Sequence, residues 1–513
     1  MELTRSLRQR WPARSWQYLL LAIILLTPSL WLLATVPPLW RDSDAYNQLT
    51  KHPALATAWG HGPLYCLVAR VPLYLGYAIE RCRGPVLPAM PNNLGNSGLT
   101  NTGILLLIAA QHLALCAAAL TFIRATTPCF GIRLLLAVAF ASVPIFYTFA
   151  HCVGSETLSM ILLLLFAASA LRIASSPAEP SFGALYVFAV LLYLAILTRY
   201  VNSLLVLVLP ITFLVAALRG RARVHFRSAC IALAIGIASL AFARNSTAQI
   251  TQWKKLNYLP RPGFTFLWRL KFLTSLSETE RGAVLDRVDQ RVRSEDAKKL
   301  VALLRETLRD EVRAQPIAIY DSVGGTLFAP DSKVRAVTRI RRADEAMNEV
   351  ARAFLSPPTP PHWRAAAADF AAARRWPCGE IVRYLFETTA YIFPRLNEMP
   401  ELSRLSTFRA ASAASLAEIP ERHPYLQLWR NVSLNHCLAV VLSGFLILLL
   451  RGVATAVYGA ILTLVGCAMI FSTCLMGAMI QRYTLPLWEL SFVTIAIFIA
   501  ALASRPEHSR ARY

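Results

Sequence analysis

The chain has few charged residues for its length. Only 16% of its 513 residues are Asp, Glu, Lys or Arg, and 56% are hydrophobic, whereas soluble proteins carry about a quarter charged residues. The charged residues are also unevenly placed, because 51 of them lie in residues 244–433 and only 30 in the rest of the chain. This scarcity excludes a soluble globular enzyme and a disordered chain. It predicts a polytopic membrane protein with one large polar insertion.

The cysteine patterns of a structural metal site are also missing. The ten cysteines include no CxxC pair and no Cys/His cluster with metal-ligand spacing, which argues against structural zinc. Half of them lie inside apolar runs, where they are expected to pack as small hydrophobic residues. Cys82 and Cys378 fall in segments expected outside the membrane, and the sequence leaves open whether they form a disulfide.

The formal net charge of +23 does not point to nucleic acid. The insertion holds 30 basic and 21 acidic residues, a mixture that is typical of solvated helix faces. The other basic residues lie at the ends of apolar runs, where membrane topology alone would place them. No nucleic-acid partner is therefore expected.

Ten apolar runs are expected to cross the membrane, since roughly twenty apolar residues span the hydrocarbon core. The fold class is thus an all-α polytopic membrane protein, with seven spans in residues 1–243 and three in 434–513. Residues 41–102 form an outer acidic loop between the first two spans. The runs are Ser15–Trp40, Gly103–Ile123, Leu134–Ala150, Thr157–Leu171, Phe182–Thr198, Tyr200–Leu218, Ser228–Ala243, Leu434–Leu450, Val453–Ile480 and Thr484–Ala503.

Lys and Arg in the short loops set the orientation. With the N-terminus in the cytoplasm, the inner loops hold fifteen basic residues and the outer short loops hold seven. This bias predicts that both termini lie inside and that the insertion, residues 244–433, lies outside. The insertion is expected to be mostly helical, because its apolar residues recur at helical spacing and Ser277 with Glu280 resembles a capping box. His61–Ile79 contains Arg70 and two prolines, so it is expected to be a helix at the outer surface and not a span.

Acidic residues outside the insertion are rare, and five of the eight are expected at the outer face. These five are Asp42, Asp44, Glu80, Glu156 and Glu489. An acid within or beside an apolar run is costly and tends to mark function. Taken singly, each has a structural explanation: the Asp pair as a helix cap, Glu156 as a favourable helix N-terminal acid, and Glu489 as an arginine partner. Their shared location favours function.

Other polar and aromatic residues are expected at the same boundary. They are Lys51, His52, His61, His151, Tyr200, and the two segments Thr198-Arg199-Tyr200 and Gln481-Arg482-Tyr483. Carboxylates and arginines from four separate loops would therefore meet at one membrane face. Such a layout suits a substrate with a lipid tail and a charged head.

Five short motifs follow one another along the chain. Asp42-Ser43-Asp44-Ala45-Tyr46 follows the first span, and Gly62-Pro63-Leu64-Tyr65, Ser155-Glu156-Thr157-Leu158, Leu197-Thr198-Arg199 and Arg482-Tyr483 follow in turn. In these motifs the chain resembles bacterial membrane glycosyltransferases of the GT-C superfamily, and it is similar to protein mannosyltransferases and aminoarabinose transferases of lipid A. Tyr200 replaces the proline that the family has after its Leu-Thr-Arg turn. The resemblance covers about the first 240 and the last 80 residues, and not the insertion.

The resemblance implies transfer of a sugar from a polyprenyl-phosphate donor to a lipid, glycan or protein acceptor. The site would lie on the outer face of a bacterial inner membrane. Asp42, Asp44 and Glu156 are the candidate catalytic residues, and a carboxylate of the outer loop would take the acceptor proton. Arg199, Arg482 and Tyr483 would bind the donor phosphate. A divalent cation, Mg²⁺ or Mn²⁺, held by Asp42 and Asp44 is a further possibility.

Three other functions fit the same pattern. A transporter or lipid flippase would place ionisable residues nearer the bilayer midplane, and Glu489 is the one candidate at that depth. An O-antigen polymerase or ligase also uses lipid-linked sugars, with different motifs. A non-catalytic scaffold would use the insertion to bind a partner.

Overall fold

The computed structural model describes residues 11–40, 63–84, 99–175, 180–218, 222–253, 262–309, 319, 336–392, 412–451 and 455–503. Nearly all of these residues are helical, and two short strands form the one sheet in this part of the chain. The prediction of an all-α fold is confirmed.

Within the described residues, seven helices are long and apolar enough to cross a membrane, so the chain is an integral, multi-pass membrane protein. They are α2 (Trp11–Thr35), α5 (Asn101–Thr126), α8 (Ser155–Ala174), η1 (Tyr200–Leu207) continued by α10 (Val208–Leu218), α11 (Ala222–Trp253), α24 (Thr455–Met476), and η4 (Gln481–Thr484) continued by α25 (Leu485–Ala503). Two shorter apolar helices, α9 (Phe182–Thr198) and α23 (Leu434–Leu450), have 17 residues each. All ten predicted runs contain helix, and the count of ten spans stays a prediction.

The predicted run Leu134–Ala150 is broken into α6 (Phe130–Ala141) and α7 (Pro144–Ala150), which meet at 65°. Proline disfavours helical geometry in the residue before it and offers no N–H to the preceding turn. Val143 accordingly has an extended backbone, with φ −91° and ψ 101°. If α6 and α7 together make one span, the number of candidate spans in the described residues rises to eight.

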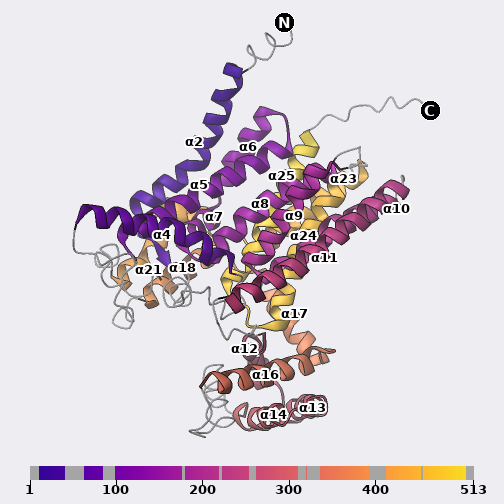
Figure 1. The fold of residues 1–513 in the computed structure, drawn as a ribbon. Coiled ribbons are helices and arrows are strands. Elements are labelled where there is room, and N and C mark those ends of the chain that lie inside the picture. The colour runs from indigo at the N-terminus through magenta and orange to yellow at the C-terminus, as the bar shows by residue number, and fades with distance from the viewer. Residues whose placement is uncertain are drawn as a thin grey trace.

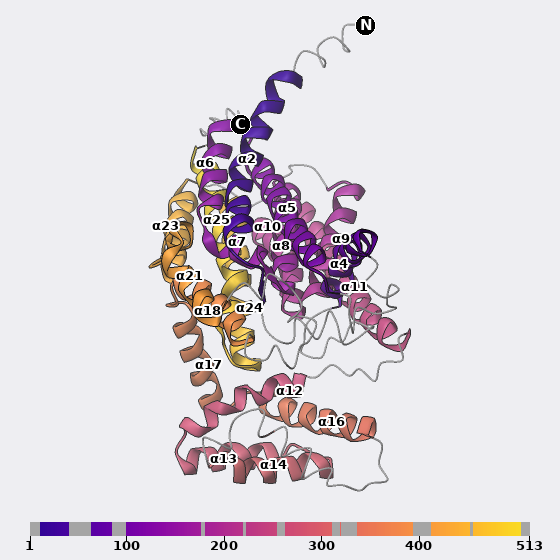
Figure 2. The same cartoon turned by 90° about the vertical axis from the view of Figure 1, so that its left-hand side faces the viewer.

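The predicted surface helix is present as α4 (Leu64–Arg83), and it is not among the helices apolar enough to cross a membrane. Figures 1 and 2 show α4 running across α5 and not alongside it. The two backbones touch where they cross, because a Cβ atom on Gly76 would lie 2.2 Å from the Cα of Gly103. On the other side of α4, Leu67, Val71 and Leu75 are exposed.

The first span ends earlier than the sequence suggested. Helix α2 stops at Thr35, before Pro37 and Pro38, and the chain continues as strand β1 (Leu39–Trp40). Strand β1 pairs in parallel with β2 (Cys152–Val153), with Trp40 opposite Val153. This two-stranded sheet joins the segment after α2 to the segment just before α8.

Helices of the insertion belong to two hydrophobic cores. One core is formed by α12 (Pro262–Leu267), η2 (Arg269–Ser275), α13 (Glu278–Asp289), α14 (Glu295–Thr307) and α16 (Ala336–Leu355). Figures 1 and 2 show this group apart from the helix bundle, at the end of α17 (Pro360–Ala373). As the sequence predicted, Ser277 caps α13 by accepting from the backbone N–H of Glu280. The helices α17, α18 (Cys378–Ile392) and α22 (Pro424–Gln427) contribute side chains to the main core instead, whereas α21 (Ala413–Arg422) packs against α18.

Candidate functional site

Glu156, Arg199 and Arg482 come together from three separate elements. The guanidinium Nη1 of Arg199 lies 2.7 Å from Oε1 of Glu156, and Nε of Arg482 lies 3.9 Å from the same oxygen. Tyr483 joins them, because its ring centroid lies 5.8 Å from the Arg199 guanidinium carbon and 5.2 Å from that of Arg482. The sequence motifs around residues 156, 199 and 482 thus meet in one cluster, called the Glu156 cluster below.

The first turn of α8 carries Glu156, where the helix dipole favours a carboxylate. The preceding turn is held by Tyr65, whose hydroxyl accepts from the backbone N–H of Gly154 at 3.0 Å and donates to Gln111 Oε1 at 3.1 Å. Gln111 in turn donates to the carbonyls of Ala150 and Cys152. The Pro-Leu-Tyr and Ser-Glu motifs are therefore linked through hydrogen bonds. Gln111 was not singled out by the sequence, because a single amide in an apolar run carries no motif.

Arg199 sits at the junction of α9 and η1. Its extended backbone, with φ −151° and ψ 128°, ends the α-helix and redirects the chain. Asn202 fixes this junction, because its side-chain amide donates to Ser159 Oγ on α8 and to the carbonyl of Ala195 on α9. Asn202 is fully buried. It is a second supporting residue that the motifs did not reveal.

Arg482 and Tyr483 lie in η4, the short 3-10 turn that opens the last span. The amide N–H of Tyr483 donates to the carbonyl of Ile480 and so closes this turn. Helix α18 of the insertion packs against η4 and against strand β1. The insertion thus helps to hold the loop that carries Arg482.

The Glu156 cluster is largely removed from solvent. The side chains of Glu156, Arg199 and Arg482 are 3%, 10% and 9% exposed. A charge at such a position is strongly destabilising when its partner is removed. One carboxylate here serves two guanidinium groups, each of which has further N–H donors in a planar arrangement that suits the oxygens of a phosphate.

Strand β1, which leads into residues 41–102, is held by helix α18. Trp40 is fully buried, and its backbone N–H and carbonyl both bond to the hydroxyl of Thr389 on α18, at 3.0 and 3.2 Å. Two residues further along the sequence comes the predicted base, Asp42. Five predicted site residues lie outside the described residues: Asp42, Asp44, Lys51, His52 and His61.

His151 is fully buried and takes part in a chain of hydrogen bonds. One ring nitrogen, Nε2, lies 2.9 Å from the carbonyl of Val36, and the other, Nδ1, lies 3.1 Å from Nε2 of His112. Its own carbonyl accepts from Leu39 of strand β1. Burial lowers the pKa of His151 to about 4, although the Val36 carbonyl favours the protonated form. These contacts tie the first loop to the turn before α8.

Glu489 is buried in α25, and in the part of the chain that the structure describes neither of its carboxyl oxygens has a hydrogen-bond partner. No ion pair joins it to Arg482 within these residues, and the guanidinium of Arg482 is paired with Glu156 instead. The structural explanation of Glu489 as an arginine partner is therefore not supported. Tyr200 is half-buried at the first position of η1.

The described residues were also compared with the predictions of a disulfide and of a metal site. Cys82 is exposed and Cys378 is buried, and neither is in a disulfide. Within the described ranges, no group of three or more His, Cys, Asp or Glu side chains could hold a metal ion. A cation bound by Asp42 and Asp44 stays a prediction, because both residues lie outside those ranges.

No protein-family model matches the chain, and no curated protein matches it. Among solved structures it is similar to ArnT from Cupriavidus metallidurans. The apo form is 12% identical over 90% of this chain and 78% of that one, with a TM-score of 0.31. The form bound to undecaprenyl phosphate is 16% identical over 93% and 78%, with a TM-score of 0.32. ArnT is an aminoarabinose transferase of the GT-C fold, the group that the motifs resemble. Superpositions this loose transfer no ligand and no residue role.

Proposed function

We propose that the protein is a membrane glycosyltransferase that uses a polyprenyl-phosphate sugar. The observation that carries the proposal is the meeting of Arg199 and Arg482 at one carboxylate, Glu156, at the end of three apolar helices. Two arginines held together beside hydrocarbon suit a lipid phosphate, which is anionic and lies at the membrane boundary. The motif order of the GT-C family supports the same substrate class.

The reaction forms a bond between an acceptor hydroxyl oxygen and the anomeric carbon of the sugar. The bond from that carbon to the phosphate oxygen breaks, and the polyprenyl phosphate leaves with the electron pair. Arg199 and Arg482 would stabilise the growing negative charge on the phosphate, with bidentate contacts that strengthen as charge develops. The Tyr483 hydroxyl would add a neutral donor beside them.

In this proposal Glu156 positions the arginines. Its Oε1 is paired with the Arg199 guanidinium at 2.7 Å and its side chain is 3% exposed, an ion pair shielded from solvent that does not suit a proton acceptor. The base is then a carboxylate of the outer loop, Asp42 or Asp44. The backbone of Trp40 is hydrogen-bonded to the Thr389 hydroxyl and Trp40 is paired with Val153, so these contacts fix where that loop begins.

The proposal also includes the side of the membrane that the site faces and a bound divalent cation. The site would face the periplasm of a bacterial inner membrane, as the distribution of basic residues favours. Asp42 and Asp44 would hold Mg²⁺ or Mn²⁺ near the phosphate, since hard cations prefer carboxylate oxygens. Loss of transfer in EDTA, with recovery on adding Mg²⁺ or Mn²⁺, would support the cation, and full activity in EDTA would remove it.

A transfer assay tests the function. The purified full-length chain is supplied with polyprenyl-phosphate sugars and membrane extracts, and release of free polyprenyl phosphate is measured. Asp42→Asn should lower turnover by about a hundred- to ten-thousand-fold, the usual contribution of a general base. Asp286→Asn in α13 is the matched control and should leave turnover unchanged. No release with any polyprenyl-phosphate sugar would contradict the proposal.

A transporter is the second candidate, and Glu489 favours it. An intramembrane carboxyl whose oxygens lack hydrogen-bond partners within the described residues is typical of an ion or substrate pathway. Uptake into vesicles that is abolished by Glu489→Gln would establish this alternative. Transfer activity that survives Glu489→Gln would favour the glycosyltransferase.

A further inference from the structure

The hydroxyl of Thr389 takes the place of a third strand beside the two-stranded sheet. Trp40 in β1 is fully buried, so its backbone N–H and carbonyl need partners within the protein. Thr389 Oγ1 accepts from this N–H at 3.0 Å and lies 3.2 Å from the carbonyl, to which it can donate. Thus a single side chain of α18 serves both backbone groups that Trp40 turns away from β2.

This contact joins two segments that are 349 residues apart in the chain. Trp40 follows the first span, whereas Thr389 belongs to the insertion and is 1% exposed. Thr389 Oγ1 also lies 2.8 Å from the carbonyl of Leu385 in its own helix. A hydroxyl has one proton and two lone pairs. The bond from the Trp40 N–H uses a lone pair, so it forms whichever carbonyl receives the hydroxyl proton.

The sheet passes this support on to the turn before α8. Trp40 is opposite Val153 in β2, and the N–H of Leu39 donates to the carbonyl of His151 at 3.1 Å. Hydrogen-bonded strands keep a separation of about 4.8 Å. Val153 is fully buried and comes three residues before Glu156. A shift of β1 would therefore move β2 and the start of α8 with it.

A second set of contacts holds the same turn from α4 and α5. Tyr65 accepts from the N–H of Gly154, and Gln111 donates to two carbonyls of the turn. Glu156 is thus placed by the outer surface helix on one hand and by the insertion, through β1, on the other. Its contact with Arg482, at 3.9 Å, is the longer of its two ion pairs and would be lost first if the turn moved.

From these observations we propose that Thr389 is a positioning residue for the Glu156 cluster. Its hydroxyl holds β1, β1 holds β2, and β2 holds the turn that carries Glu156. The insertion then supports the site without supplying a group that touches the substrate. The consequence for sugar transfer rests on the proposed function, whereas the consequence for the turn does not.

Hydrogen exchange of the full-length chain in detergent tests the path from Thr389 to the turn. Thr389→Val keeps the shape of the side chain and removes the hydroxyl. Exchange should rise about two- to tenfold at residues 39–40 and also at residues 152–154, the usual worth of one hydrogen bond. Thr389→Ser keeps the hydroxyl and should restore the exchange of the unmodified protein. Unchanged exchange at residues 152–154 in Thr389→Val would overturn the proposal, because the support would then end at β1.

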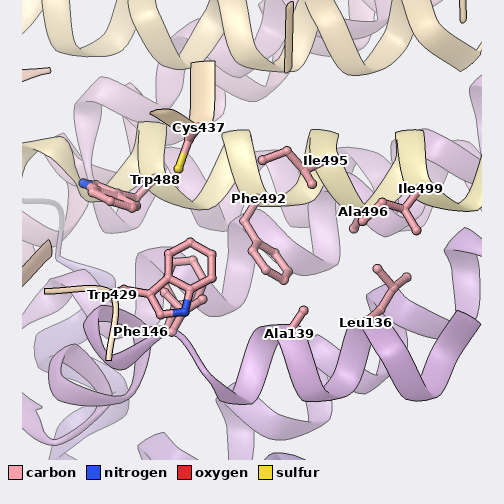
Figure 3. A pocket seen from close by; sticks show the side chains of 11 residues that line it. Leu136, Ala139, Phe146, Trp429, Cys437, Trp488, Phe492, Ile495, Ala496 and Ile499 are labelled. Atoms are coloured by element: carbon pink, nitrogen blue, oxygen red, sulfur yellow. The ribbon is translucent and has the colours of Figure 1, made fainter. Parts of the chain in front are cut away.

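Two controls separate positioning from a general loss of stability. Thr388→Val removes a neighbouring hydroxyl that bonds to the carbonyl of Tyr384 in its own helix, and it should leave exchange unchanged. Leu136→Ala enlarges an apolar cavity between α6, α23 and α25, none of whose lining residues belongs to β1 or β2 (Figure 3). It should lower the unfolding temperature but not speed exchange at residues 152–154. If it sped exchange there as much as Thr389→Val, the proposal would be wrong.

Transfer kinetics test the role of Thr389 in the site. With a polyprenyl-phosphate sugar, Thr389→Val should lower kcat or raise the donor KM about tenfold or more, because a small displacement of binding groups is costly. The acceptor KM should change little, and Thr389→Ser should restore the rate. Unchanged donor kinetics together with faster exchange at residues 152–154 would overturn the positioning role.

The two measurements fail separately. If the unmodified protein transfers no sugar, the proposed function is wrong, and hydrogen exchange still decides whether Thr389 holds the turn. Thr389→Cys, whose thiol is a weaker donor and acceptor, replaces Thr389→Val if the latter does not fold. It should give smaller changes in the same two segments, and no change in either would overturn the proposal.

Discussion

Arg199 forms an ion pair with Glu156, with 2.7 Å between Nη1 and Oε1, and both side chains are at most 10% exposed. The two residues belong to different motifs, one at the start of α8 and one at the end of α9. A buried ion pair is retained at a cost in desolvation, and removal of one partner leaves the other charge uncompensated. The contribution of the Glu156 cluster to stability can therefore be tested without a substrate.

Glu156→Gln should destabilise the protein strongly. Both Arg199 and Arg482 would lose their shared carboxylate, and breaking a buried pair typically costs about 3–5 kcal/mol. Thermal unfolding in detergent measures the effect. Glu418→Gln is the control, because its pair with Arg422 is exposed and should matter little. If the two variants unfolded at the same temperature, the cluster would not hold these elements together.

Arg482→Lys should raise the donor KM or lower kcat at least tenfold, with little change in the acceptor KM. Lysine keeps the charge but cannot make two parallel hydrogen bonds to a phosphate. Arg199→Lys should behave similarly, and Arg422→Lys, on an exposed surface, serves as the control. Unchanged donor kinetics in both Lys variants would mean that the arginines only support the structure, and the phosphate site would then be sought near His151 and Lys51.

The orientation can be tested with cysteines that the protein already has. Cys82 and Cys129 are both exposed, and they lie in loops predicted on the outer and inner side. A membrane-impermeant maleimide should label Cys82 in intact cells and Cys129 only after lysis. Cys82→Ser and Cys129→Ser variants identify the labelled residue. The reverse pattern would place the insertion in the cytoplasm and overturn the proposed outer site.

Gly76→Ala should destabilise the crossing of α4 and α5. The new Cβ would lie 2.2 Å from backbone atoms of Gly103, so the helices must move apart. Overpacking of this kind costs about 1–3 kcal/mol, which should lower the unfolding temperature. Gly131→Ala in α6 is the matched control, because no heavy atom lies within 4 Å of its new Cβ. Equal stability of both variants would mean that α4 and α5 are farther apart than the contact between Gly76 and Gly103 indicates.

His362 should make the protein less stable in mild acid. Burial and then the charge of Arg269 lower its pKa to about 4, from an ordinary 6.5. The unfolded chain therefore takes up this proton first, so the contribution of neutral His362 is complete above about pH 6.5 and is lost as the pH falls to about 4. Unfolding temperatures between pH 7 and 4 measure this slope. His362→Gln should reduce the slope but not abolish it, because the pKa of His151 is lowered similarly, and an unchanged slope would exclude His362 as a contributor.

Much of the fold could be predicted from the distribution of apolar and charged residues. Every predicted apolar run contains helix, and α4 is a helix that is not apolar enough to span. These features depend on local composition, since a membrane span must satisfy its own backbone hydrogen bonds within one apolar helix. The breaks were harder to predict. The run Leu134–Ala150 was expected to be continuous, although Pro144 bends it by 65°.

The sequence alone indicated which residue types belong to the candidate site, because charges are rare in apolar runs and stand out there. It predicted a common face for residues 156, 199 and 482, but it could not assign partners. Only the tertiary structure decided that Glu156, and not Glu489, pairs with Arg482. It also showed that Tyr65, Gln111 and Asn202 support the cluster. Partner choice depends on helix rotation and on contacts between distant segments, and local periodicity carries no information about either.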